Sequence, residues 1–194
     1  MIAAVVLAAG TSSRLGSPKQ LLSFRGRPVL VAVVENLLTS RLDRVVVVLG
    51  HQSGEVARVL EGLPVEVVVN QRYIEGQASS LKCGLAALDP EVRAALFALG
   101  DQPLVRPSTV RLLVDGYRSA GGIAAPFYQG QRGNPVIFDR RFFPDLELLK
   151  GDAGAREIIR SNPESLLRVD VDDPGVVLDI DTWEDYQNII CIKL

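Results

Sequence analysis

Nearly continuous apolar runs, rich in β-branched residues, recur in the first half of the chain at residues 2–7, 45–49, 65–69 and 94–99. Runs without polar alternation are typical of strands covered on both faces of a sheet. Apolar residues with helical spacing lie between and after these runs, within residues 30–38 and 110–117. This alternation of strands and helices predicts an α/β fold with a parallel sheet wrapped by helices.

The pattern changes after Gly121. Short strand-like pieces at 123–126 and 135–138 flank a polar segment, which predicts a small β-hairpin excursion from the main sheet. Pro126 and Pro135 are expected at a strand end or edge, because proline cannot donate to a ladder. Further elements are expected as helices near 146–149 and 155–160, strands near 167–171 and 176–180, and a closing helix from Thr182. No linker is evident, so we expect a single domain over residues 1–194.

Composition limits the possible partners. Twenty-one Lys and Arg residues against 23 Asp and Glu residues give a net charge of −2, which argues against a broad surface for nucleic acid or an anionic membrane. The longest apolar run, residues 1–9, is shorter than the ~20 residues of a membrane span and lacks the basic start of a signal peptide. Cys83 and Cys191 have no second thiol or histidine at ligand spacing, which argues against a zinc site or disulfide framework. We therefore expect a cytoplasmic protein.

The segment after the first apolar run, Leu-Ala-Ala-Gly-Thr-Ser-Ser-Arg-Leu-Gly-Ser-Pro-Lys at 7–19, combines small residues with two cations, Arg14 and Lys19. Small residues let backbone N–H groups approach an anion closely, so the loop could cradle phosphate oxygens. The spacing matches neither the Walker pattern nor the dinucleotide-binding glycine pattern. An ordinary loop with surface cations is the alternative interpretation.

Acidic residues lie where a metal ion would be expected. Asp101 follows the fourth apolar run, and ligands of open α/β sheets bind at the carboxyl ends of strands. Mg²⁺ prefers one or two protein carboxylates together with water and substrate phosphates. Asp179 and Asp181 alternate along an expected strand, so they would point to the same face and could complete the site. Alternatively, Asp101 caps the helix near Pro107 and Asp181 caps the last helix.

A polar segment at 70–80 follows the third apolar run and leads into a helix. Its hydroxyl groups could contact the edge of a base, although Ser79 or Ser80 could equally be a plain helix N-cap. His51, the only histidine, is expected to be a solvated loop residue.

Several motifs stand in order along nearly the whole chain: the 7–19 loop, Gly-Asp-Gln-Pro at 100–103, Asn70 with Gly76 and Ser80, Arg-Gly-Asn-Pro-Val at 132–136, Gly-Asp-Ala-Gly-Ala-Arg at 151–156, and Asp-Ile-Asp-Thr-Trp-Glu-Asp-Tyr at 179–186. Together they resemble the molybdenum cofactor cytidylyltransferases, within the group that includes the guanylyltransferase of the same cofactor. The first and last motifs are shared broadly among nucleotidyltransferases. The blocks at 132–136 and 151–156 are narrower and select the molybdenum cofactor branch.

The resemblance implies a Rossmann-like three-layer α/β/α nucleotidyltransferase fold and a role for each matching residue. Arg14, Lys19 and Asp101 would be catalytic, and Asp101, Asp179 and Asp181 would bind Mg²⁺. The nucleotide would contact Leu7, Ala8, Ala9, Gly10, Arg14, Lys19, Gly76, Ser79, Ser80 and Gly100. The acceptor would contact Arg132, Gly133, Asn134, Pro135, Asp152 and Arg156. Trp183 departs from the family, which often has proline there.

The implied reaction is transfer of CMP from CTP to the terminal phosphate of molybdopterin, with release of pyrophosphate. Ala9 stands where guanylyl-transferring relatives tend to have glycine, which favours a pyrimidine because its Cβ fills space that a purine would need. The alternatives are a nucleotidyltransferase of the same fold that uses GTP or a sugar phosphate, and a non-catalytic carrier that hands the cofactor to a client molybdoenzyme. Neither nucleic acid nor a membrane is expected as a partner.

Overall fold

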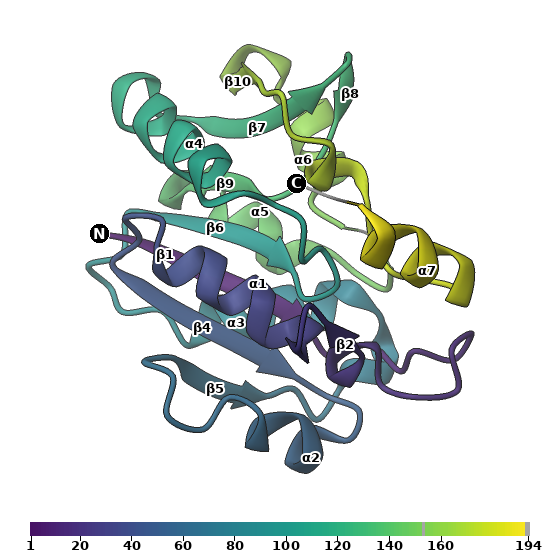
Figure 1. Cartoon of the computed structure of the whole chain (residues 1–194). Coiled ribbons are helices and arrows are strands. Elements are labelled where there is room, and N and C mark those ends of the chain that lie inside the picture. Colours follow the sequence, from purple (N-terminus) through teal and green to yellow (C-terminus); the bar gives the residue numbers. More distant parts are fainter. Residues whose placement is uncertain (153, 193–194) are drawn as a thin grey trace.

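The computed structural model describes residues 1–152 and 154–192. The main sheet has the strand order β10-β7-β9-β6-β1-β4-β5, with β8 paired to β7 (Figure 1). The strands are β1 (Ile2–Ala8), β2 (Ser23–Phe24), β3 (Arg27–Pro28), β4 (Arg44–Leu49), β5 (Glu66–Val69), β6 (Ala94–Leu99), β7 (Ile123–Tyr128), β8 (Gln131–Arg132), β9 (Val136–Asp139) and β10 (Leu166–Asp170). The helices are α1 (Val29–Leu38), α2 (Ser53–Arg58), α3 (Gln77–Ala86), α4 (Pro107–Ala120), α5 (Phe143–Leu148), α6 (Arg156–Ser161) and α7 (Trp183–Cys191). Short 3₁₀ turns are η1 (Lys19–Leu21), η2 (Tyr73–Glu75), η3 (Arg140–Phe142), η4 (Pro163–Ser165) and η5 (Pro174–Val177).

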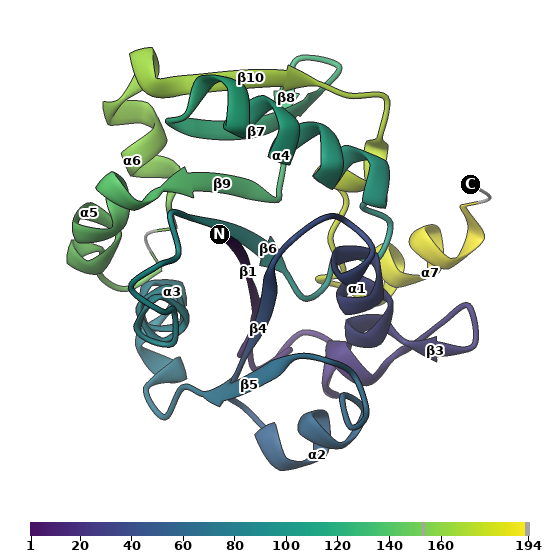
Figure 2. The same cartoon turned by 90° about the vertical axis from the view of Figure 1, so that its left-hand side faces the viewer.

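The sheet is the middle of three layers, as expected from the strand–helix alternation. Figure 2 shows α1 and α4 on one side of the sheet and α3, α5 and α6 on the other. Along β1, Ala4 and Val6 pack toward α1 and α4, whereas Val5 between them packs toward α3. Successive strand residues point to opposite faces, so a strand buried on both sides must be apolar at every position. The continuous apolar runs reflect this arrangement.

One of those four runs is not covered on both faces. Strand β5 alternates between half-buried and exposed residues, and the side chains of Val67 and Val69 are 36% and 43% exposed. The prediction for this run was wrong because β5 pairs only with β4 and forms an edge of the sheet.

The expected hairpin is part of the main sheet. Strand β9 lies between β6 and β7 and runs antiparallel to both, while β7 and β10 pair in parallel. Only the far end of β7, together with β8, projects as a two-residue ribbon. The excursion is therefore smaller than predicted, and the sheet is mixed but mostly parallel.

Pro126 lies inside β7, beside Val169 of β10, and not at a strand end or edge as predicted. The ladder between β7 and β9 has already ended at Ala124 and Ile137, and Pro126 contributes its carbonyl, which accepts from Gly133 N at 2.9 Å. Proline has no backbone N–H, but it is tolerated here because this position contributes its carbonyl as a hydrogen-bond acceptor. Pro135 immediately precedes β9, as expected.

The strand predicted at 176–180 does not form. The segment begins instead with the turn η5, where buried Asp173 accepts from Gly175 N at 3.0 Å, Arg106 N at 2.9 Å and Thr109 Oγ1 at 2.6 Å. These contacts attach the segment to the start of α4 instead of a sheet edge. Helix α7 then begins after Thr182, whose hydroxyl accepts from Asp185 N in a capping box. Among the described residues, no helix combines the length and apolar character needed to cross a membrane.

Candidate functional site

The loop after β1 is held between the ends of β4 and β6. A Cβ on Gly100 would lie 2.8 Å from Ala8 Cβ, and a Cβ on Gly50 would lie 2.7 Å from the Ala9 carbonyl oxygen. The residue that follows each of the two neighbouring strands must therefore be glycine for the loop to fit. Buried Gln20 supports the loop from inside, because its Nε2 donates to the Ala8 carbonyl at 2.9 Å. No local sequence pattern identifies Gln20, because its role depends on the fold of the loop.

Lys19 and Asp101 meet beyond the carboxyl ends of β1 and β6. Lys19 Nζ lies 2.5 Å from Asp101 Oδ2 and 2.8 Å from Asp181 Oδ1, and only 15% of the lysine side chain and 13% of the Asp101 side chain are exposed. The Lys19 backbone is fixed by Ser12, whose Oγ accepts from Lys19 N at 3.0 Å. The structure therefore brings together the cation of the first loop and the carboxylate that follows β6.

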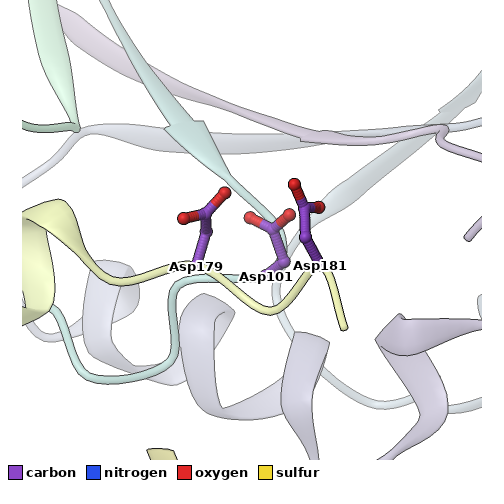
Figure 3. A group of neighbouring side chains, drawn as sticks. All are labelled: Asp101, Asp179 and Asp181. Atoms are coloured by element: carbon purple, nitrogen blue, oxygen red, sulfur yellow. The ribbon is translucent and has the colours of Figure 1, made fainter. Parts of the chain in front are cut away.

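Three carboxylates converge beside Lys19. Oxygens of Asp101, Asp179 and Asp181 lie within 4.8 Å of one another, and Figure 3 shows the three side chains rising next to each other from two segments. The backbone joins the segments, because Ile180 N donates to the Asp101 carbonyl at 3.2 Å. Asp179 and Asp181 thus share a face as predicted, although they lie on an extended segment and not on a strand.

The helix-cap alternatives for these acids are wrong. Helix α4 has Arg106 at its N-cap position, and buried Asp173 accepts from the backbone there, so Asp101 plays no part. Helix α7 is capped by Thr182 and not by Asp181. Asp173 is one of several acids in the segment 170–173, and no local sequence pattern distinguishes it from the others.

The charge of the cluster is unbalanced. Burial raises the pKa of the Asp101 carboxyl, and the Lys19 ammonium opposes this shift. Burial also raises the pKa of Asp179, followed by repulsion from Asp101 and Asp181. For Lys19, burial lowers the pKa, but the attraction of Asp101 and Asp181 outweighs it and the pKa lies above its ordinary value. Three carboxylates thus face one well-placed lysine.

These residues fit a divalent metal ion. Within the described part of the chain, buried Asp101 Oδ1 has no hydrogen-bond partner, and an unpaired buried carboxylate oxygen is costly. Hard divalent cations such as Mg²⁺ take carboxylate oxygens as ligands. Asp101, Asp179 and Asp181 could therefore hold such an ion, with Asp101 as the innermost ligand.

A cavity of about 580 Å³ opens beside this cluster. Among the predicted nucleotide and metal residues, it is lined by Leu7, Ala8, Ala9, Gly10, Lys19, Gly76, Ser80, Gly100, Asp101, Asp179 and Asp181. Tyr73, Ile74 and Gln77 also line it, although the sequence analysis did not name them among the nucleotide-binding residues.

Arg14 and Ser79 do not line this cavity. The Arg14 side chain is 72% exposed and reaches Asp181 at 3.6 Å, so it lies at the rim and not in the interior. Ser79 turns away, since its hydroxyl donates to the Gly76 carbonyl at 2.8 Å and faces a separate hollow beside Lys82. The N-cap of α3 is Gly76, so neither Ser79 nor Ser80 is the cap.

A second cavity, of about 440 Å³, adjoins the first. Among the predicted acceptor residues it is lined by Arg132, Gly133, Asn134, Asp152 and Arg156. Pro135 lies elsewhere, next to a small apolar void near α1. Residue 153, which is part of the 151–156 motif, lies outside the described residues. The two cavities share Leu7, Gln77, Leu99 and Asp152 in their linings, so they lie side by side.

The lining of the second cavity includes two arginines and two acids, Asp152 and Glu157. Arg132 is half-buried, and its pKa is lowered, first by burial and then by the nearby charge of Arg156. In the part of the chain that the structure describes, neither guanidinium lies within 4.0 Å of a carboxylate. The second cavity therefore offers two cationic side chains to an anionic ligand, next to the acidic Asp152 and Glu157.

Comparison with known proteins fits this geometry. Residues 4–167 match the model of the MobA-like NTP transferase domain. The chain belongs to this family. It is thus an enzyme of the nucleotidyltransferase class, in the group that includes the molybdenum cofactor nucleotidyltransferases, and the predicted fold is confirmed.

Three MobA-like relatives cover the chain almost completely. A crystal structure of Rv0371c from Mycobacterium tuberculosis H37Rv is 36% identical, with a TM-score of 0.86 and 97% of each chain covered, and a second structure of that protein is a complex with manganese. A nucleotidyl transferase from Methanothermobacter thermautotroptrophicus, Mth528, is 29% identical over 97% of this chain and 95% of that chain, with a TM-score of 0.85. Nicotine blue oxidoreductase from Paenarthrobacter nicotinovorans is 33% identical over 97% of this chain and 96% of the relative.

Proposed function

We propose that this nucleotidyltransferase transfers CMP from CTP to the terminal phosphate of molybdopterin and releases pyrophosphate. The observation that supports the proposal most is the shared wall of the two cavities at Leu7, Gln77, Leu99 and Asp152. A nucleotide beside the acidic cluster and an anionic acceptor beside Arg132 and Arg156 would meet at this wall. Holding two reactants in contact converts a bimolecular step into an effectively unimolecular one.

The nucleotide is assigned to the cavity with the acidic cluster. Backbone N–H groups of the loop after β1 and the ammonium of Lys19 would bind the triphosphate, and Arg14 at the rim could close over its outer phosphates. The base would lie toward Ala9, Gly76 and Ser80. Ser79 is positioned to support Ser80 and not to contact the base, because Asn70 Nδ2 donates to both hydroxyls, at 2.8 Å and 3.1 Å.

Asp101, Asp179 and Asp181 would hold Mg²⁺, which supplies charge neutralisation at the phosphates when it is bound. The manganese complex of Rv0371c supports a divalent ion in this family. Lys19 and Arg14 would also neutralise phosphate charge, which is needed because the two substrates are anions that repel each other.

The chemical step needs no general base. An oxygen of the acceptor phosphate attacks the α-phosphorus of CTP, and the bond from the α-phosphorus to the bridging oxygen breaks, so pyrophosphate leaves with that electron pair. A phosphomonoester has a second pKa near ~6 and is largely ionised at neutral pH. The role of the chain is therefore to position the two anions and balance their charge.

The choice of CTP and molybdopterin depends on Ala9 and on the motifs at 132–136 and 151–156. GTP as donor, or a sugar phosphate as acceptor, remains compatible with the same geometry. A non-catalytic carrier that serves a client molybdoenzyme is disfavoured, because a carrier needs no cluster of three acids beside a buried lysine. A single domain over 1–194 and a cytoplasmic location are part of the proposal, and both cysteines are free.

A second candidate activity is a reduction, because a relative covered over nearly its full length is named nicotine blue oxidoreductase. In that case the hollow would bind a reduced nucleotide cofactor and a planar acceptor. The acidic cluster disfavours this activity, since hydride transfer does not require a site for a divalent ion.

One assay distinguishes these activities. Purified protein with Mg²⁺ is given each of the four ribonucleoside triphosphates in turn, with either molybdopterin or a sugar phosphate as acceptor, and pyrophosphate release is measured. We expect release with CTP that depends on molybdopterin. Release with GTP alone would assign the guanylyl activity, and release with a sugar phosphate would assign another acceptor. No release, together with enzyme-dependent loss of nicotine blue in the presence of a reduced nucleotide cofactor, would assign the reductase.

A further inference from the structure

Lys19 contacts one oxygen in each of two carboxylates that a metal ion would use. Its Nζ contacts Asp101 Oδ2 and Asp181 Oδ1, so two of the three acids of the cluster are already paired with an internal cation. The Lys19–Asp101 pair is largely shielded from water, which strengthens the attraction between the two charges. In the protein as it stands, the ammonium thus partly neutralises the cluster.

Lys19 also lines the cavity assigned to the triphosphate. Its backbone is fixed by the Ser12 hydroxyl and by the turn η1, whereas its side chain is a flexible four-carbon stem that can redirect its ammonium without a change in the backbone. The same ammonium therefore has two sets of anionic partners within reach, the carboxylates and the phosphates.

A divalent ion and the ammonium would compete for the cluster. Both are cations that need the oxygens of Asp101 and Asp181, and two cations placed side by side repel each other. If the ammonium moved to a phosphate, it would leave the carboxylates free for the metal and would neutralise part of the charge of the phosphate. Arg14 cannot play this part, because it is largely exposed and reaches only Asp181.

We propose that Lys19 is an exchangeable counter-ion of the acidic cluster, so that a divalent metal ion binds weakly to the free enzyme and strongly together with a nucleoside triphosphate. This inference rests on the proposed function only in placing a triphosphate in this cavity. Coupling of this kind is reciprocal, so the metal and the nucleotide each strengthen the binding of the other.

The test measures direct binding of Mn²⁺ at pH 8. The paramagnetic resonance signal of the free ion reports how much Mn²⁺ is unbound, and no turnover is involved. Without nucleotide, we expect Lys19→Met to bind Mn²⁺ at least ten times more tightly than the wild type. With a non-hydrolysable CTP or GTP analogue, and after correction for Mn²⁺ on the free analogue, we expect the wild type to gain at least tenfold in Mn²⁺ affinity. Lys19→Met should lose most of this gain.

A control variant separates the exchange from a general effect of charge. Lys82→Met removes a cation from the separate hollow beside Ser79, away from the acidic cluster, so it should change Mn²⁺ affinity less than threefold. Thermal unfolding checks that each variant is folded.

Unchanged or weaker Mn²⁺ binding by folded Lys19→Met without nucleotide would overturn the proposal. If that variant does not fold, absence of a nucleotide-dependent gain in the wild type overturns it equally. The comparison without nucleotide contains no substrate, so its result is independent of whether CTP is the donor.

Discussion

Lys19 Nζ lies 2.5 Å from Asp101 Oδ2, in a contact that is largely shielded from solvent. The two residues follow β1 and β6, which are neighbouring parallel strands. Parallel strands present their carboxyl ends at one edge of a sheet, so residues from distant parts of the sequence meet there. In the proposed function, the triphosphate and the metal ion would bind beside this contact.

Removing the charge of Asp101 should abolish most of the activity. Asp101→Asn keeps the size of the side chain but weakens both the ion pair and the metal ligand, and loss of one such electrostatic partner typically costs ~10² to 10³ in rate. Pyrophosphate release under saturating CTP measures the effect. Asp172→Asn, on an exposed residue of the same charge, serves as the control. Equal activity of Asp101→Asn and wild type would remove Asp101 from the site.

The two arginines of the second cavity should affect the acceptor and not the nucleotide. Arg132→Met or Arg156→Met removes a charged hydrogen-bond donor, which corresponds to a loss of about 1.5–3 kcal/mol, or roughly 10- to 100-fold in acceptor affinity. Steady-state kinetics should show a higher KM for molybdopterin and an unchanged KM for CTP. Arg168→Met, on an exposed arginine of β10, is the matched control. A rise in the KM for CTP alone would place the nucleotide in this cavity.

Ala9 should influence the choice of base. Its side chain is buried at the wall of the nucleotide cavity, so Ala9→Gly opens space beside the base. We expect the ratio of kcat/KM for CTP to that for GTP to fall by about tenfold, the usual scale for one methyl-sized group. An unchanged ratio would mean that the base is recognised elsewhere.

The cap of α7 should make stability depend on pH. Hydrogen bonds from the Thr182 hydroxyl and from backbone N–H groups hold the pKa of Asp185 below its ordinary value, although partial burial opposes this shift. A carboxyl with a lowered pKa in the folded state stabilises the fold at neutral pH, and this contribution disappears as the pH falls through that lowered pKa. Asp185→Asn should therefore lower the unfolding free energy by about 1 kcal/mol at pH 7, the usual scale of a helix cap, and less in acid.

Denaturant unfolding at pH 7 and pH 3 measures this difference. Glu184→Gln changes a neighbouring exposed acid that makes no capping contact, so its stability should match the wild type at both values. A destabilisation of Asp185→Asn that is equal at pH 7 and pH 3 would contradict the assigned cause.

Much of the site could be predicted because it depends on local sequence and on sheet geometry. The small residues after β1 and the acid after β6 each stand at the end of a buried strand, and the order of the parallel strands brings them together. Asp179 and Asp181 share a face as predicted, although the predicted strand does not form. Alternation along an extended backbone is enough to put them on one face.

The remaining features depend on tertiary contacts that leave no local pattern. Gln20 supports the first loop through a carbonyl that becomes available only after the loop has folded. Asp173 converts an expected strand into a turn by binding the start of α4. The exposure of Arg14 likewise follows from the path of its loop and not from its spacing to Lys19.

The most direct test uses CTP labelled at the α-phosphorus, with molybdopterin as acceptor. The expected result is that the label appears in a product containing both cytidine and the pterin, in equal amount to the pyrophosphate released, and that Asp101→Asn lowers both together. Label that stays in CTP, or is released as CMP without joining an acceptor, would contradict nucleotidyl transfer to an acceptor held in the adjoining cavity.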